Sequence, residues 1–295
     1  MSTYARVIQK ARFELYRENV EGALDVLRGA RATDPDPRFG AEIVRIEGWL
    51  SHLASRDAYV HAQEHQYHGL RWRMGLKFLE KQVRILLGRK TRKMVRRRAA
   101  NKEFQLLEAA ARAVGARRVV DGGCGEGAVA MALGSRNPSL SVDAVDASAT
   151  NVRLARRLNR WKNVSFRQGL IEEVHLLFPE GGVDLVYSFA VLEHVRDVDE
   201  TVRSVLAVLR PGGRFCFVVP MREFTVNGEL PEYTPIHGFL DHIRVFSESE
   251  LRDRFGKYDD FTLTKLPSTF EPEDVEKALV PIEFGAFFVA FGKPR

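Results

Sequence analysis

Hydrophobic and polar residues change their spacing near residue 117 of this chain. Before that point apolar residues recur every three or four positions, as at Val7, Ala11 and Leu15, which predicts helices. Beyond it short apolar runs alternate with helical segments, an order typical of a parallel sheet covered on both faces. Seven strands are expected, at 118–121, 141–146, 164–168, 183–189, 214–219, 261–266 and 282–291. Helices are expected between the first five strands at 127–135, 149–160 and 198–209.

The first 60 residues form the first predicted unit, an all-helical extension. Asp34-Pro35-Asp36-Pro37 is expected to end its second helix, because proline disfavours helix in the preceding residue. The run from Tyr16 to Pro35 resembles part of a tetratricopeptide repeat, with its Ala23-Leu24 pair and its Asp-Pro close. A second helix pair would begin at Ala41. At most two repeats fit, fewer than a solenoid needs, so a helical hairpin packed on the main domain is predicted.

Residues 61–104 form the second predicted unit, a basic helical segment. Its apolar stripe is Leu76, Leu79, Val83 and Leu86. Between residues 71 and 98 only Glu80 opposes the basic residues, which are Arg71, Arg73, Lys77, Lys81, Arg84, Arg89, Lys90, Arg92, Lys93, Arg96, Arg97 and Arg98. Asn101 is expected to cap the next helix, residues 102–114, which Gly115 would close.

Three interpretations of the stretch 71–98 stay open. It is a solvated helix that faces a partner without binding a ligand. Alternatively it adheres to an anionic membrane surface or a charged glycolipid, which Trp72 and Phe78 beside the basic residues would suit. The third interpretation is nucleic acid, although no base-reading module accompanies the charges.

Length and composition favour a packed, cytoplasmic protein. The chain has 295 residues, of which 45% are hydrophobic, and a formal net charge of +6. Its two cysteines do not suggest a disulfide framework, and neither an apolar signal core nor a spanning apolar stretch is present. The protein is expected in the cytoplasm, with the inner face of a membrane as a peripheral location. His61, His65 and His68 share one helical face, but a solvated helix is favoured and no metal is expected.

The strongest motif lies at residues 119–127, Val-Val-Asp-Gly-Gly-Cys-Gly-Glu-Gly. Glycines let backbone amides approach a ligand, and the following helix start adds unsatisfied N–H groups. The spacing G-x-G-x-G differs from the dinucleotide and P-loop motifs, and Asp121 suits a cationic ligand better than a pyrophosphate. The run closely resembles the first motif of class I S-adenosylmethionine-dependent methyltransferases. The resemblance implies that Asp121, Gly123, Cys124, Gly125 and Gly127 bind the cofactor S-adenosyl-L-methionine.

Three further motifs extend this resemblance over residues 105–295, the third predicted unit. Asp146, at the end of the second strand, and Ala147 would bind the ribose, with a helix-capping role beside Ser148 as the alternative. Family members usually carry Gly-Asp after the third strand, but here Leu170 follows Gly169. Backbone groups of Leu170 and Ile171 would flank the adenine, with Glu172 as a substitute acceptor.

The fourth motif continues from the fourth strand into a Leu-Glu-His-Val run at residues 192–195. Ser188, Phe189 and Ala190 are expected near the methionine part of the cofactor, because ligands bind outside the carboxyl ends of the strands. The implied fold is α/β, a Rossmann-like seven-stranded methyltransferase sheet whose last two strands form an antiparallel hairpin, with an all-helical N-terminal extension.

The implied function is methyl transfer to a hydroxyl of a small molecule or a lipid-linked glycan. A hydroxyl acceptor needs a base near neutral pKa, and His194, His237 and His242 are the candidates. The last two lie in a 220–247 insertion expected to act as a lid. One rival is an RNA or protein methyltransferase that docks through the basic segment. Another is a non-catalytic scaffold that binds the cofactor and recruits a partner.

Overall fold

The computed structural model describes residues 3–16, 20–53, 89–221, 246–266 and 286–293. Several predicted features lie outside these residues: His61, His65 and His68, the apolar stripe from Leu76 to Leu86, and nearly all of the 220–247 insertion with His237 and His242.

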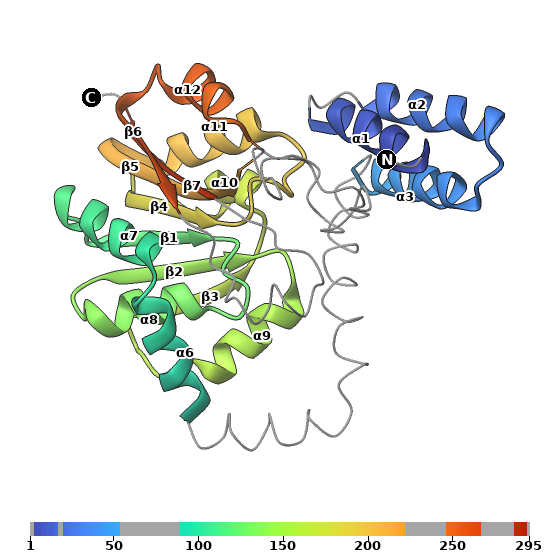
Figure 1. The fold of residues 1–295 in the computed structure, drawn as a ribbon. Coiled ribbons are helices and arrows are strands. Elements are labelled where there is room, and N and C mark those ends of the chain that lie inside the picture. The colour runs from blue at the N-terminus through green and yellow to red at the C-terminus, as the bar shows by residue number, and fades with distance from the viewer. Residues whose placement is uncertain (1–2, 17–19, 54–88, 222–245, 267–285, 294–295) are drawn as a thin grey trace.

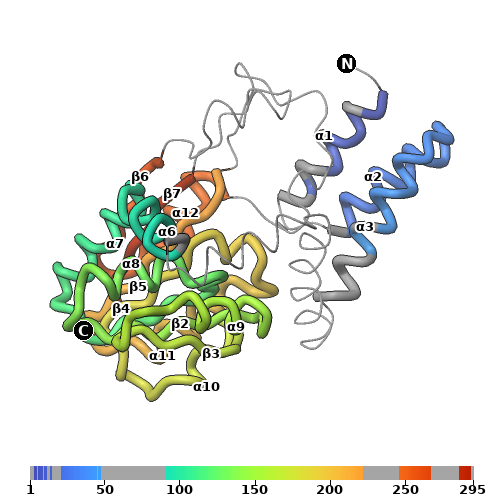
Figure 2. The backbone as a smooth tube through the Cα atoms, turned by 90° about the horizontal axis from the view of Figure 1, so that it is seen from below, coloured from blue at the N-terminus to red at the C-terminus, as the bar shows by residue number. Residues whose placement is uncertain are grey.

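The N-terminal unit consists of three helices, α1 (Thr3–Tyr16), α2 (Val20–Thr33) and α3 (Pro37–Leu53), packed side by side (Figure 2). Their contact is apolar and includes Ile8 and Ala11 of α1, Leu24 and Leu27 of α2, and Phe39 of α3. The end of α2 at Thr33 confirms the predicted effect of the two prolines. Pro37 then begins α3, where a missing N–H costs nothing.

The seven strands form one sheet in the order β3-β2-β1-β4-β5-β7-β6, which confirms the predicted seven-stranded sheet. The strands are β1 (Arg118–Gly122), β2 (Ser141–Asp146), β3 (Val164–Gln168), β4 (Val183–Phe189), β5 (Leu209–Pro220), β6 (Asp259–Leu266) and β7 (Ala286–Gly292). Strand β7 pairs antiparallel with both β5 and β6, which confirms the expected closing hairpin.

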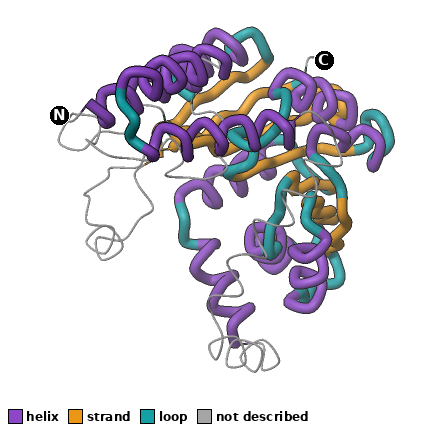
Figure 3. Tube along the Cα trace, turned by 90° about the vertical axis from the view of Figure 1, so that its right-hand side faces the viewer, coloured by secondary structure: helices purple, strands orange, loops and turns teal. Residues whose placement is uncertain are grey.

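Helices cover both faces of the sheet and create two separate apolar cores (Figures 1 and 3). One face carries α6 (Arg89–Ala99), α7 (Lys102–Ala113), α8 (Ala128–Arg136) and α9 (Ala149–Leu158). The other carries η1 (Ile171–Glu173), α10 (Val174–Leu177), α11 (Val198–Val208) and α12 (Glu248–Phe255).

Helix α6 belongs to the sheet domain. Val95 is buried in the core shared with α8, and Thr91 donates its hydroxyl hydrogen to the Leu158 carbonyl at 3.3 Å. The predicted division at residue 105 therefore cuts across packed elements. Asn101 does occupy the cap position of α7, but its amide donates to Glu103 at 2.9 Å instead of capping the first turn, so the expected cap is wrong.

Candidate functional site

The glycine-rich turn between β1 and α8 is fixed at one end and open at the other. The N–H groups of Gly123 and Cys124 both donate to the Val145 carbonyl, at 2.8 and 2.9 Å. At Gly123 φ is +87°, and an added Cβ would overlap the Val191 side chain. At Gly125 φ is +52°, yet no heavy atom would lie within 4 Å of an added Cβ. The turn therefore presents open backbone at Gly125, where a ligand can approach closely.

The first turn of α8 has free capacity for an anionic or polar group. Its N-cap is Gly127, with φ +80°, which has no side chain to cap the helix, and of the first-turn N–H groups that of Ala130 donates to Asp121. The first N–H groups of a helix have no intrahelical partner, and the helix dipole places partial positive charge there.

Asp146, at the carboxyl end of β2, holds the same turn from the side. Its carboxylate accepts from Gly125 N at 2.7 Å, from Ser148 N at 3.0 Å and from Asn151 Nδ2 at 3.2 Å. Ser148 itself caps α9 by accepting from Asn151 N at 3.1 Å. The capping alternative is thus correct for Ser148, whereas the ribose contact of Asp146 stays a prediction. Next to it, the Ala147 carbonyl accepts from the Gln168 side chain at 3.0 Å.

Asp121, at the end of β1, is a buried acid whose Oδ2 atom has no hydrogen-bond partner. Burial raises the pKa of Asp121 to about 7, and the charge of Asp146 adds to this, while Tyr187 and Arg98 act in the opposite direction. Buried polar atoms are nearly always paired, so this oxygen has capacity for a donor, either the facing Tyr187 hydroxyl or a ligand. The same burial, with the charges of Asp121 and Asp146, raises the pKa of the half-buried Cys124 thiol.

Tyr187 and Arg98 were not among the residues expected at the site. Tyr187 stands opposite Asp121 in the β1–β4 register, and its buried hydroxyl also lacks a hydrogen-bond partner. This proximity follows from strand order, which the motif spacing alone does not give. Arg98 acts from the end of α6 and forms an ion pair with Glu103 at 3.5 Å.

The loop after β3 departs from the expectation for Glu172. Leu170 and Ile171 are buried, and the backbone N–H of Gly169 donates to the Asp146 carbonyl at 3.0 Å. The Glu172 carboxylate is also buried and accepts from the Arg196 N–H at 3.2 Å. It stabilises the segment after β4, which argues against its use as an acceptor for adenine.

The exit of β4 borders the glycine-rich turn. The buried Ser188 hydroxyl donates to the Gly122 carbonyl at 2.8 Å, so its side chain serves the fold. Phe189 lies against Tyr187 and Phe288. Ala190 has φ of +56°, a conformation unfavourable for residues with a Cβ, and its N–H donates to Val218 O at 2.9 Å. Such strain clusters at functional positions.

His194 lies four residues beyond Ala190, half-buried, with its N–H donating to the Val191 carbonyl at 2.8 Å. The carboxyl ends of β1, β2 and β4 thus bring together the glycine-rich turn, Asp146, Ala190 and His194. Among the described residues no group of His, Cys, Asp and Glu could hold a metal ion. Within the same residues, every helix is too short or too polar to cross a membrane.

Comparison with known proteins decides the family. A methyltransferase domain model matches residues 88–266, more than half of the chain. The chain belongs to this methyltransferase domain family. The match begins at residue 88, so it gives no support to the tetratricopeptide resemblance of the N-terminal helices.

Individual relatives match parts of the chain. A probable S-adenosylmethionine-dependent methyltransferase of Mycolicibacterium smegmatis is 33% identical over 138 residues, 46% of this chain and 49% of the relative. Trans-aconitate 2-methyltransferase of Deinococcus radiodurans is 30% identical over 164 residues, 50% of this chain and 61% of the relative. The chain thus spans about half to three fifths of these relatives. The crystal structure of YcgJ from Bacillus subtilis has a TM-score of 0.48 and 22% identity, and covers 65% of this chain and 98% of that chain.

Family membership makes this a class I methyltransferase domain with S-adenosylmethionine as cofactor. Two features of the site fit that molecule. The unpaired Asp121 oxygen can accept from its ammonium group, and the open backbone at Gly125 allows close approach.

Proposed function

We propose that the protein transfers the methyl group of S-adenosylmethionine to a hydroxyl of a small molecule or glycan. The observation that carries the proposal is the packing of the β4 exit on the glycine-rich turn, which Val191 makes over Gly123. His194 follows three residues later on the same turn, so the donor and a candidate base share one edge of the sheet.

Sequence and relatives favour a small acceptor. One relative is named for trans-aconitate, a small molecule. Many amino-nitrogen methylating enzymes carry Asn/Asp-Pro-Pro-Tyr/Phe after the fourth strand. Here Phe189-Ala190-Val191-Leu192 stands at that position, which counts against a base or amide nitrogen as acceptor.

The protein residues have three tasks in such a reaction. The cofactor supplies a methyl group that its sulfonium already activates. The glycine-rich turn and Asp146 would hold the donor, and the β4 exit would align the acceptor oxygen with the methyl carbon. The oxygen–carbon bond would form as the carbon–sulfur bond of the donor breaks and S-adenosylhomocysteine leaves. The hydroxyl proton must also leave, and the imidazole of His194 would take it.

The test is the single substitution His194→Ala, with His175→Ala as the matched control. His175 lies on α10 and bonds to the Ser204 hydroxyl at 2.7 Å, away from the β4 exit. Methyl transfer from labelled S-adenosylmethionine would be measured against a panel of hydroxylated small molecules, sugars and RNA. Binding of S-adenosylhomocysteine would be measured alongside. We expect His194→Ala to lose about 10²–10⁴ in turnover with cofactor affinity intact, and His175→Ala to keep its turnover.

Other results would redirect the proposal. Full turnover by His194→Ala would exclude this base and leave His237 and His242, outside the described residues, for the same substitution. Turnover on RNA alone would favour the nucleic-acid rival, and cofactor binding without turnover on any acceptor would favour the scaffold.

A further inference from the structure

Three helices on one face of the sheet contain no acidic residue. They are α6, α8 and α9, and their basic residues are Arg89, Lys90, Arg92, Lys93, Arg96, Arg97, Arg98, Arg136, Arg153, Arg156 and Arg157. On the opposite face, α11 and α12 mix both signs, with ion pairs Arg252–Glu248 at 2.8 Å and Arg254–Asp199 at 3.3 Å. Within the described residues these three helices therefore carry basic charge alone, whereas α7 on the same face contributes Glu103 and Glu108, which pair with Arg98 and Arg136.

Helix α6 packs on the fold through its apolar side, and of its basic residues Arg98 pairs with Glu103. Thr91, Met94 and Val95 pack inward. Its exposed basic residues border a hollow of about 520 Å³ and have no acidic partner in the described part of the chain; they are Arg92, Lys93, Arg96 and Arg97.

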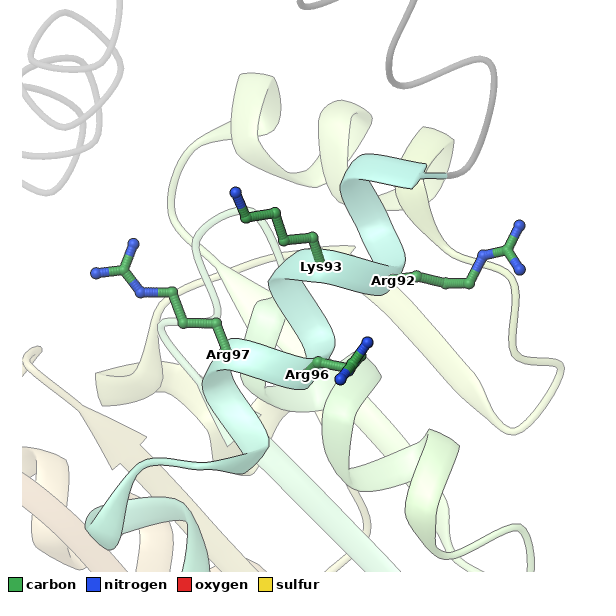
Figure 4. Close-up of a pocket in the computed structure, with 4 residues that line it drawn as sticks. All are labelled: Arg92, Lys93, Arg96 and Arg97. Carbon is green, nitrogen blue, oxygen red and sulfur yellow. The ribbon is translucent and has the colours of Figure 1, made fainter.

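These four side chains form two rows along α6. Figure 4 shows Lys93 and Arg97 extending to one side and Arg92 and Arg96 to the other. Both pairs are four residues apart, a spacing at which like charges destabilise a helix. No acidic residue in the first turn offsets the helix dipole. Such a helix is stabilised by an external array of negative charge.

The basic surface continues onto α9. The hydrogen bond from Thr91 to the Leu158 carbonyl joins the start of α6 to the end of α9. Arg157 and Arg160, on either side of this junction, are exposed and have no acidic partner among the described residues. Arg156 differs, since it donates to the Phe166 carbonyl at 2.7 Å and is held within the fold. We call Arg92, Lys93, Arg96, Arg97, Arg157 and Arg160 the α6–α9 basic surface.

We propose that the α6–α9 basic surface docks the protein on an anionic lipid bilayer through its phosphate headgroups. Five of the six side chains are guanidinium groups, which bind phosphate oxygens in pairs. The exposed large hydrophobic side chains of the described residues are Val44 and Leu176, neither on α6 nor α9. Trp161, next to Arg160, is half-buried and packs against the core, so the described part of this surface has no fully exposed ring on which bases could stack. The sequence just before α6 adds Trp72 and Phe78 to further basic residues, a composition suited to a membrane surface.

The test is sedimentation of the full chain with vesicles of about 30% phosphatidylglycerol in phosphatidylcholine. The variant is Arg92→Gln/Lys93→Gln/Arg96→Gln/Arg97→Gln, which keeps residues with good helix propensity. The matched control is Arg203→Gln/Arg252→Gln/Arg254→Gln/Lys257→Gln, on the α11–α12 side of the sheet. Each variant lowers the formal net charge of +6 by four, so total charge is the same in both.

We expect the wild type to bind these vesicles at about 0.05 M salt, to release at about 0.5 M salt, and to ignore pure phosphatidylcholine vesicles. The α6 variant should bind roughly 10²–10³-fold more weakly, and the control within a few-fold of the wild type. Circular dichroism and S-adenosylhomocysteine binding should be unchanged in both, which excludes misfolding. The proposal is overturned by three outcomes: no wild-type binding at low salt, equal losses in both variants, or release of bound vesicles by an equal phosphate concentration of duplex RNA.

Discussion

The turn after β1 and the exit of β4 meet at one edge of the sheet, but they are stabilised by different kinds of contact. The β1 turn is held by backbone N–H groups: Gly123 and Cys124 bond to β2, and Gly125 bonds to Asp146. The β4 exit combines packing, with a strained Ala190 and the apolar side chain of Val191, with hydrogen bonds to residues distant in sequence, from Ala190 N–H to Val218 O and from Arg196 N–H to the Glu172 carboxylate. The β1 turn is specified by a local sequence motif, whereas the β4 exit depends on contacts with other parts of the fold.

This difference matches the two molecules that a methyltransferase must bind. A cofactor common to a family can be recognised by a conformation that a short glycine motif encodes. An acceptor that varies among relatives requires a surface whose residues can change, and loops provide that surface. Gly123 is where the two regions touch, because its missing Cβ leaves room for Val191.

The sharpest way to break this arrangement is Gly123→Ala. The new Cβ would adopt a left-handed φ of +87° and overlap Val191, so we expect a loss of about 2–5 kcal/mol in unfolding free energy and weak cofactor binding. Gly125→Ala is the control, because it has left-handed φ with open space and should cost only about 1–2 kcal/mol. Urea unfolding measures both. Adding Val191→Ala to Gly123→Ala should recover part of the loss; no recovery would show that the two regions do not meet there.

The second change, Asp146→Ala, affects the β1 turn and the start of α9 but not the β4 exit. It removes the acceptor for Gly125 N and the proposed ribose contact, so S-adenosylhomocysteine should bind roughly 5- to 150-fold more weakly, about 1–3 kcal/mol by calorimetry. Asp143→Ala is the control on the same strand. That carboxylate is paired with Arg118 at 3.1 Å and Ser165 at 2.6 Å, so its removal should lower stability and leave cofactor affinity unchanged. Equal affinity in the wild type and Asp146→Ala would refute the ribose role.

The third prediction concerns the pH dependence of cofactor binding. Since burial raises the pKa of Asp121 to about 7, the carboxyl is protonated below that pH, whereas the cofactor ammonium needs it ionised. Affinity should therefore rise about five-fold from pH 6 to pH 7 and about two-fold more by pH 8, and then level off. Asp121→Asn should bind weakly with no such rise.

The same raised pKa has a consequence for stability. The ligand-free protein should lose unfolding free energy as the pH rises from about 4, the unfolded value, to about 7. Asp121→Asn should remove that loss. An unchanged pH profile in this variant would assign the ionisation to another group.

The spacing of apolar and polar residues was sufficient to predict the bounds of strands that depend on residues close in the sequence. Strands β2, β3 and β4 have the predicted bounds. Strands β2 and β4 are buried along most of their length, whereas β3, at the edge of the sheet, alternates buried and exposed residues. Strand β5 begins at Leu209 and not at 214, since pairing with β4 continues past a register shift between Val183 and Leu185. Local spacing does not encode such a shift.

The site residues also fall into two groups, those that the motif predicts and those whose contacts depend on the fold. The glycine-rich turn and Asp146 lie together as the motif indicates. By contrast, Glu172 bonds to Arg196, 24 residues away, and Tyr187 faces Asp121 only because β4 lies beside β1. Partners separated this far in sequence become visible only with strand order and packing.

The smallest expected effect belongs to Ala190→Gly. Removing the Cβ relieves a left-handed φ of +56°, worth roughly 1–2 kcal/mol, while glycine costs roughly 0.5–1 kcal/mol in unfolded-chain entropy. The free energy of unfolding should therefore rise by about 0.5 kcal/mol. The same substitution at the exposed Ala109 within α7 should lower it by about 1 kcal/mol, so the two changes have opposite signs. If both variants lose stability equally, Ala190 is unstrained. If Ala190→Gly gains stability but loses turnover with cofactor affinity intact, the strain serves the acceptor side of the site.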